Sequence, residues 1–156
     1  MSAPPAGTPT FPPSAEVAAF RALVYGHYRR HSRPLPWRET NDPYAILVSE
    51  VMLQQTQVDR VARKYAQFLA RFPDISTLAC APLGEVLVAW QGLGYNRRAV
   101  ALKRCAEAIV ERHGGTLPDA VEALERLPGI GPYTARAVAA FAFGQPTVFI
   151  ETNIRT

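Results

Sequence analysis

Lysine and cysteine are both scarce in this chain of 156 residues. Its 17 basic side chains include only two lysines, Lys64 and Lys103, and no lysine follows Lys103. Schiff-base chemistry by a lysine amine is therefore excluded from the segment after Lys103. The two cysteines, Cys80 and Cys105, match no CxxC or metal-ligand spacing. The sequence predicts reduced thiols in the core and no disulfide framework.

Long hydrophobic runs and strand-like alternation are also missing. No apolar run is long enough to cross a membrane, and no window sustains the period of two that is typical of a strand. Residues 1–14, MSAPPAGTPTFPPS, hold five of the 14 prolines and lack the basic and apolar regions of a signal peptide. We expect a flexible, proline-rich leader there, one domain over residues 15–156, no membrane partner and a cytoplasmic, intracellular location.

Helical spacing of apolar residues is present instead. A first helix is predicted from Ser14, with its apolar stripe formed by Val17, Phe20, Leu23, Val24 and Tyr28. Capping and breaking residues predict further helices that begin near Asp42, Asp74, Pro82, Asn96 and Pro132. The helix from Asn96 should end at Gly114 and bury Leu102, Ala106, Ile109 and Val110. Residues 147–150 are too few to predict a strand, so the fold class is predicted to be all-α.

The hexapeptide LPGIGP, residues 127–132, is the expected turn between two helices. Its alternate glycines allow positive φ and leave no Cβ in the way of an approaching backbone. Pro132 suits the first position of the next helix, whose N-terminal amides would then form a phosphate site that is indifferent to base sequence. An ordinary helix–helix turn is the alternative. The net charge of +4 agrees with a polyanionic partner without proving one.

The decapeptide SEVMLQQTQV, residues 49–58, places the carboxylate of Glu50 in an apolar stretch. On a helix that starts at Pro43, this carboxylate shares its face with Ile46 and Leu47. Burial there should raise its pKa, and a carboxyl group that keeps its proton near neutral pH can act as a general acid. The alternative is a structural carboxylate paired with an arginine.

Several segments together resemble the helix-hairpin-helix DNA glycosylases, and most closely the adenine DNA glycosylase (MutY) family. They are PWR (36–38), PYAILVSEVMLQQTQV (43–58), WQGLGY (90–95), LPGIGPYTARAVAAFAFG (127–144) and VFIETNIR (148–155). The resemblance implies an endonuclease III-like HhH-GPD fold and a nucleoid-associated enzyme of base-excision repair. Such an enzyme flips adenine out of a mispair with 8-oxoguanine or guanine in double-stranded DNA and hydrolyses its N-glycosidic bond.

The resemblance assigns catalytic roles residue by residue. Glu50 matches the acid that protonates the departing purine. Glu151 and Asn153 match the segment that stabilises the positive charge developing on the sugar. Tyr133 stands where the endonuclease III branch has its Schiff-base lysine, which implies a monofunctional glycosylase that leaves the strand uncut.

Binding roles follow from the same resemblance. Trp37 and Arg38 match residues near the base pocket. The positions that match DNA contacts are Gln55, Thr56, Leu93, Tyr95, Leu127, Gly129, Ile130 and Gly131. The glycines around Leu93 and Tyr95 favour an exposed turn that could wedge into the duplex, with core packing as the alternative for Leu93.

Two departures from the family pattern leave other functions open. Glu151 replaces the family's aspartate, and misplacement of a reacting group by about 1 Å can lower a rate about a hundredfold. The chain ends before the family's four cluster-binding cysteines, so we expect an incomplete domain with no iron–sulfur cluster, metal site or small-molecule cofactor of its own. The alternatives are a non-catalytic DNA-binding remnant, or a glycosylase for another mispaired base such as thymine.

Overall fold

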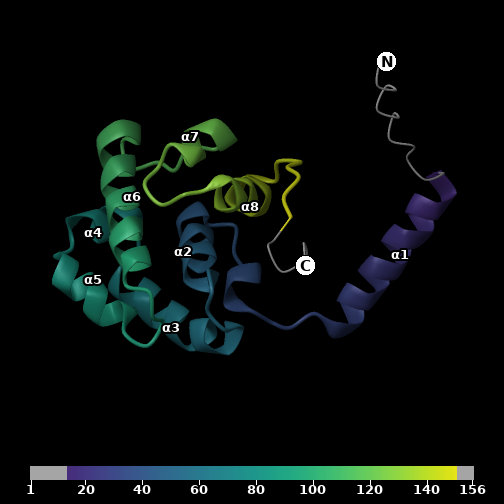
Figure 1. Cartoon of the computed structure of the whole chain (residues 1–156), viewed down its shortest axis with the longest axis horizontal. Coiled ribbons are helices and arrows are strands. Elements are labelled where there is room, and N and C mark those ends of the chain that lie inside the picture. The colour runs from purple at the N-terminus through teal and green to yellow at the C-terminus, as the bar shows by residue number, and fades with distance from the viewer. Residues whose placement is uncertain (1–13, 151–156) are drawn as a thin grey trace, which may run out of the picture. The chain divides into compact units, whose positions relative to one another are not determined.

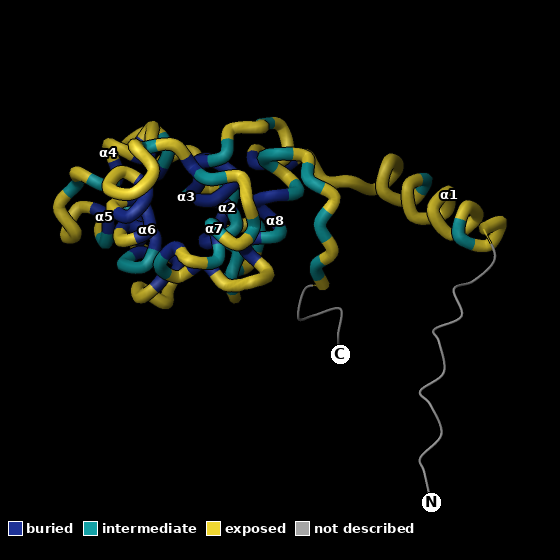
Figure 2. The backbone as a smooth tube through the Cα atoms, turned by 90° about the horizontal axis from the view of Figure 1, so that it is seen from above, coloured by how far each residue is buried: buried dark blue, intermediate teal, exposed yellow. Residues whose placement is uncertain are grey.

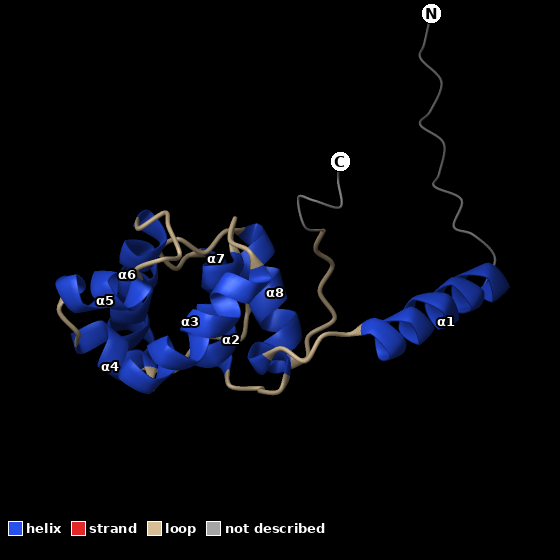
Figure 3. Ribbon diagram, turned by 90° about the horizontal axis from the view of Figure 1, so that it is seen from below, coloured by secondary structure: helices blue, strands red, loops and turns tan. Residues whose placement is uncertain are grey.

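The computed structural model describes residues 14–150, which form helices joined by loops (Figure 1). No strand occurs in this range (Figure 3), and residues 147–150 are irregular, so the all-α prediction is confirmed. The chain divides into two compact units between Pro34 and Leu35, whereas the sequence predicted a boundary near residue 14. None of the described helices combines the length and apolar character that crossing a bilayer requires.

The first unit contains helix α1 (Ser14–His31), which begins at the residue predicted from the sequence. Glu16 lies in its first turn, and Arg29 and Arg30 lie in its last, an arrangement that suits the helix dipole. No residue of α1 is buried (Figure 2). Phe20 and Leu23 are 66% and 72% exposed, so the apolar stripe that predicted this helix faces solvent.

The second unit is built around helix α2. Its elements are η1 (Pro36–Arg38), α2 (Pro43–Leu53), α3 (Val58–Arg71), α4 (Ile75–Cys80), α5 (Leu83–Trp90), α6 (Arg97–His113), α7 (Val121–Glu125) and α8 (Pro132–Phe143). Helix α2 packs against α3, α6 and α8 and lies between the last two (Figure 1). Every residue from Tyr44 to Ser49 is buried, which makes α2 the centre of the core.

The ends of α2 follow from local chemistry. Asp42 accepts a hydrogen bond from the Tyr44 N–H at 3.0 Å, and Pro43 occupies the first helical position. At the other end Gln54 leaves the helical conformation with φ of −56° and ψ of 111°, and Gln55 has a left-handed backbone with φ of +54°. The chain therefore leaves the helix abruptly, and Gln55 is exposed.

Helix α6 ends at Gly114, whose φ of +61° is left-handed, as the sequence predicted. It buries Leu102, Ala106 and Ile109, but Val110 is 37% exposed, so the predicted burial of Val110 is wrong. Consecutive helical residues are rotated by about 100°, and this rotation carries Val110 past the edge of the face that Ile109 occupies.

The two thiols lie in different environments. Cys105 is buried in α6, and burial raises its pKa to about 12. Cys80 is exposed at the end of α4, because Ile75 and Leu78 take the buried positions of that short helix. The prediction of core thiols is therefore confirmed for Cys105 and wrong for Cys80.

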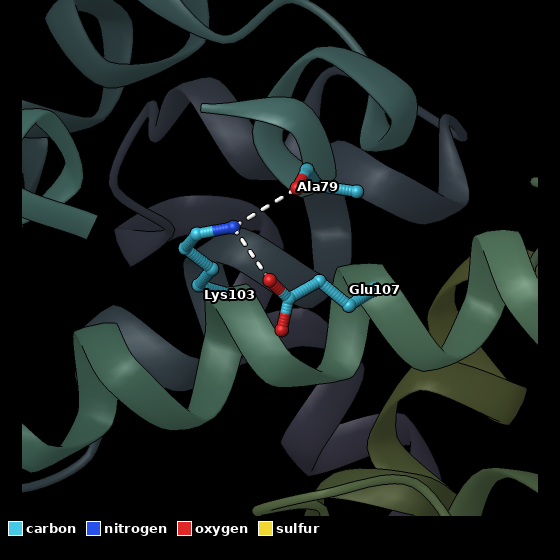
Figure 4. Close-up of polar contacts among 3 residues, drawn as sticks. All are labelled: Ala79, Lys103 and Glu107. Atoms are coloured by element: carbon cyan, nitrogen blue, oxygen red, sulfur yellow. Dashed lines mark hydrogen bonds and ion pairs between the residues drawn. The ribbon is translucent and has the colours of Figure 1, made fainter. Parts of the chain in front are cut away.

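Lys103 joins α6 to α4 through a partly buried ammonium group (Figure 4). Its Nζ donates to the carbonyl of Ala79 at 2.9 Å and to Oε1 of Glu107 at 2.7 Å. The Ala79 carbonyl belongs to the last turn of α4, where carbonyls lack helical partners. Lys103 thus caps the C-terminal end of a neighbouring helix.

Candidate active site

A cavity of about 670 Å³ in the second unit collects side chains from the end of α2, from the turn before α6 and from the start of α8. Its lining consists of Glu50, Leu53, Gln54, Gln55, Val58, Tyr95, Arg97, Arg98, Tyr133 and Thr134. Three separate parts of the chain therefore bring Glu50, Gln55, Tyr95 and Tyr133, all singled out from the sequence, to one space.

Glu50 sits in the last two turns of α2 and is half-buried. Burial raises the pKa of its carboxyl group from 4.5 to about 7, because the low-dielectric surroundings disfavour the charged form. No basic side chain among residues 14–150 forms an ion pair with it. The predicted burial and raised pKa are confirmed, and the geometry favours a proton donor over an ion-paired structural carboxylate.

The segment after α2 connects the cavity to α8 and to the turn before α6. Gln54 donates from Nε2 to Oγ1 of Thr134 at 3.2 Å. The Thr56 hydroxyl lies 3.4 Å from the carbonyl of Leu93. Gln55, held between these two contacts, projects an exposed amide at the cavity.

The turn at residues 92–95 has positive φ at Gly92 (+92°), Gly94 (+75°) and Tyr95 (+47°). Tyr95 is 55% exposed, whereas Leu93 is 2% exposed and belongs to the same core cluster as Trp90. The predicted exposure is therefore confirmed for Tyr95 and wrong for Leu93. The reversed backbone on both sides of Leu93 turns its side chain into the core, which is the alternative that the sequence had left open.

Tyr133 occupies the second position of α8, directly after Pro132. It is 36% exposed at the cavity, and its ring meets that of Phe149 edge to face with the centroids 5.4 Å apart. Its hydroxyl group is a hydrogen-bonding group in the same space as the Glu50 carboxyl.

The hairpin between α7 and α8 is anchored by the buried side chains of Leu127 and Ile130, and the Ile130 N–H donates to the Leu127 carbonyl at 3.1 Å. Gly129 has φ of +76°, and a Cβ there would lie 2.6 Å from Cβ of Ala101 in α6. Gly131 has an ordinary φ of −88°, so only one of the two glycines uses the predicted freedom. Within the described part of the chain, the N–H groups of Gly129 and Gly131 have no hydrogen-bond partner, as a phosphate-binding hairpin requires.

Other predicted site residues are not brought to this cavity. Trp37, in η1, is 9% exposed and packs edge to face on Tyr65 with the ring centroids 5.5 Å apart. Arg38 is exposed, and neither residue lines the cavity, so their base-pocket role stays a prediction. Glu151 and Asn153 lie outside the described residues, and their roles stay predictions as well.

Sequence reasoning missed Arg98 and Thr134, which are 7% and 3% exposed at the cavity. Arg98 shares the buried face of α6 with Leu102 and Cys105. A cation on an apolar helical face is the same kind of signal that singled out Glu50, and it could have identified Arg98. Thr134 gave no comparable signal, because a threonine is ordinary on a buried helical face.

The acidic, histidine and cysteine side chains of the described residues can be compared with the requirements of a metal site. Among residues 14–150 no group of three or more histidine, cysteine, aspartate or glutamate side chains is placed to hold a metal ion. A cluster bound by four cysteine thiolates needs more ligands than the two cysteines of this chain. The residues present therefore do not fit an iron–sulfur cluster.

Comparison with known proteins matches residues 48–156 to a family described as HhH-GPD superfamily base excision DNA repair protein. The chain belongs to this superfamily. It is 48% identical over 129 residues to the adenine DNA glycosylase of Mycobacterium tuberculosis, covering 82% of this chain and 42% of that protein. It is 43% identical over 149 residues to the adenine DNA glycosylase of Homo sapiens, covering 90% of this chain and 27% of that protein. The chain thus spans less than half the length of these relatives, and the predicted resemblance to them is confirmed.

Solved structures support the fold assignment. A thermostable thymine-DNA glycosylase is similar with a TM-score of 0.83 at 30% sequence identity, covering 89% of this chain and 64% of that chain. A non-covalent endonuclease III–DNA complex is similar with a TM-score of 0.74 at 20% identity, covering 88% of this chain and 64% of that chain. The second likeness concerns the fold alone.

Proposed function

We propose that this chain carries the base-releasing site of a monofunctional DNA N-glycosylase that removes adenine mispaired with 8-oxoguanine or guanine. The observation that carries the proposal is the half-buried Glu50, whose pKa is raised to about 7, in one cavity with Tyr133. The relatives named adenine DNA glycosylase support adenine as the base. Double-stranded DNA is then the partner, no small-molecule cofactor takes part, and the enzyme works at the nucleoid.

The chemistry needs one proton and one water molecule. Glu50 donates its proton to a ring nitrogen of the flipped adenine, so the electron pair of the breaking glycosidic bond leaves with a neutral base. Positive charge develops on the sugar. Tyr133 lines the cavity that would hold this sugar, and the resemblance assigns the stabilisation of the charge to Glu151 and Asn153. Water then adds to the sugar carbon, and its proton passes to the Glu50 carboxylate, which restores the acid and leaves an abasic site.

DNA would be held by groups at two places. The N–H groups of Gly129 and Gly131, which have no hydrogen-bond partner among residues 14–150, suit a backbone phosphate, which carries no sequence information. Gln55 and Tyr95 present an amide and an aromatic ring at the cavity, which suits the gap that a flipped nucleotide leaves.

A second candidate, excision of mispaired thymine, is favoured by the structural similarity to a thymine-DNA glycosylase. The sequence resemblance points the same way, because it places Asn96 where adenine DNA glycosylases often have a tyrosine. The two candidates share the cavity and differ in the base that it accepts.

The test is a single-turnover assay on end-labelled duplexes that carry adenine opposite 8-oxoguanine, with thymine opposite guanine as the comparison. Heating in alkali converts each abasic site into a strand break that can be counted. Breaks at adenine that require Glu50 support the proposal, and breaks at thymine alone support the second candidate. Duplex binding without any base release would reduce the chain to a non-catalytic DNA-binding remnant.

A further inference from the structure

Arg98, the second residue of α6, is a buried arginine whose guanidinium bonds only to uncharged oxygens among the described residues. Its Nη1 donates to the carbonyls of Val51 (3.0 Å), Met52 (2.9 Å) and Gln54. Its Nη2 donates to the carbonyls of Leu93 and Gly94, each at 3.1 Å, and to Oγ1 of Thr56 at 2.8 Å.

These acceptors belong to two separate segments. One set lies at the C-terminal end of α2, where carbonyls have no helical partner and the dipole is negative. The other set is formed by the turn that precedes α6. The planar fork of an arginine can reach both sets at once, which a lysine ammonium on its flexible stem cannot do in the same geometry. Arg98 therefore fastens the two segments to each other.

Backbone strain lies at the two residues that adjoin these bonds. Gln55 and Tyr95 are the non-glycine residues with positive φ in the described part of the chain, at +54° and +47°. Such conformations persist only when the surroundings hold them, and they gather at functional sites. Gln55 stands between two residues that Arg98 binds, and Tyr95 follows Gly94 directly.

The ring of Tyr95 also contacts the guanidinium. Cζ of Arg98 lies 5.6 Å from the Tyr95 ring centroid and 5.6 Å from that of Trp90. The cation is therefore within cation–π range of a buried and of an exposed aromatic ring. The exposed Tyr95 is thereby tied to the same group that holds the segment of Gln55.

We propose that Arg98 is a positioning residue that holds Gln55 and Tyr95 in one arrangement for reading the base opposite the excised one. The inference rests on the proposed function, because it assigns those two side chains to the duplex. Arg98 touches no reacting atom in this account and acts through the two strained residues. Its loss should change discrimination between opposing bases as well as stability.

The test compares Arg98→Lys with a matched control, Lys103→Met. Among the described residues, Lys103 is the other buried basic residue that caps a helix end, and it serves α4 instead of the cavity. Hydrogen exchange in the free protein should accelerate about tenfold or more at residues 53–57 and 92–96 in Arg98→Lys. The control should leave exchange in these two segments unchanged.

The second readout is the ratio of single-turnover rates for adenine opposite 8-oxoguanine and adenine opposite guanine. Arg98→Lys should lower this ratio about tenfold, whereas Lys103→Met should leave it unchanged even if it lowers the melting temperature. Equal losses on both duplexes, or unaltered exchange in both segments, would overturn the inference. If the parent chain releases no base, the proposed function fails while the exchange comparison still decides whether Arg98 fastens the segments.

A second variant covers the case in which Arg98→Lys does not fold. Thr56→Val removes one acceptor of the Arg98 network without changing the buried charge. Faster exchange at residues 92–96, across the network from the substitution, supports the fastening role. Exchange there that matches the parent contradicts it.

Discussion

Gln54 donates a hydrogen bond from Nε2 to Oγ1 of Thr134 at 3.2 Å, and this bond joins the end of α2 to the first turn of α8. Glu50 lies one helical turn before Gln54, and Tyr133 directly precedes Thr134. The segments that carry Glu50 and Tyr133 to the cavity are thus joined by a bond between a neutral amide and a hydroxyl group. Because no charge is involved, the link leaves the raised pKa of Glu50 intact.

Replacing Glu50 with glutamine should abolish base release and spare DNA binding. The amide keeps the size of the side chain but cannot donate a proton as an acid, so the single-turnover rate should fall by about 10²- to 10⁴-fold. Affinity for the same duplex, measured by a gel-shift titration, should stay within about twofold of the parent, as expected for an isosteric change. Base release at the parent rate by Glu50→Gln would remove the general-acid role.

The same residue predicts a dependence of stability on pH. The pKa of Glu50 rises from 4.5 to about 7 on folding, so the folded state holds the proton more tightly than the unfolded state. The stability gained from this proton is complete below pH 4.5 and is lost as the pH rises to about 7, amounting to at most about 3 kcal/mol. Glu50→Gln has no such loss, because its amide does not titrate. Its free energy of unfolding should therefore rise relative to that of the parent between pH 4 and pH 8.

Urea denaturation of both proteins at pH 4, 6 and 8 measures this difference. The variable to follow is the variant's free energy of unfolding minus that of the parent. An increase from pH 4 to pH 8 agrees with a buried acid. A constant difference would mean that the Glu50 carboxyl group is solvated in the folded protein.

The sequence located Glu50 for the physical reason that the structure shows. A carboxylate at a helical spacing from aliphatic residues is drawn into the core with them when that face of the helix packs, as it does for α2. Tyr95 and Leu93 differ, because their directions depend on left-handed backbone at Gly92 and Gly94 that residue order does not specify. Glycine permits positive φ without requiring it, so composition alone could not separate the exposed residue from the buried one.

The hairpin shows the same limit. Two alternate glycines predicted a turn, and the turn is there. Which glycine is essential depends on the close approach of Ala101 in α6, a contact between distant parts of the chain. The position of the turn could therefore be predicted from the local sequence. The need for glycine at residue 129 could not, because it arises from the packing of the hairpin against α6.

That asymmetry predicts opposite results for the two glycines. Gly131→Val should fold normally, because its φ is ordinary and a Cβ there meets nothing within 4 Å. The added side chain should obstruct a phosphate and weaken binding to all duplex sequences alike, with a shallower dependence on salt. Fluorescence anisotropy of labelled duplexes between 50 and 200 mM salt measures both effects, with roughly one fewer ion released per lost phosphate contact.

Gly129→Ala should instead destabilise the protein. Its Cβ would lie 2.6 Å from that of Ala101 at a residue with φ of +76°, so the free energy of unfolding should fall by about 1–3 kcal/mol. Urea denaturation measures the loss.

The Gly131→Val variant decides the role of the hairpin. If it binds DNA with the parent's affinity and salt dependence, the hairpin is only a structural turn.

The last prediction concerns the strand that remains after the base has left. Tyr133 lines the cavity at the start of α8, and no lysine follows Lys103 in the chain. Lys103 itself is engaged with Ala79 and Glu107, and neither Lys103 nor Lys64, the other lysine of the chain, lines the cavity. No lysine amine is therefore placed to attack the sugar carbon and form the imine that precedes strand cleavage. The product should be an intact strand with an abasic site, which breaks only on heating in alkali.

Borohydride added during turnover checks this outcome directly, because it reduces an imine to a stable protein–DNA adduct. We expect no adduct on a denaturing gel, while alkali reveals as many breaks as bases released. Tyr133→Lys is the informative companion variant, since it restores an amine at that position and should yield a trappable adduct if Tyr133 faces the sugar. A borohydride adduct with the parent chain would show that another amine reaches the sugar and would remove the monofunctional assignment.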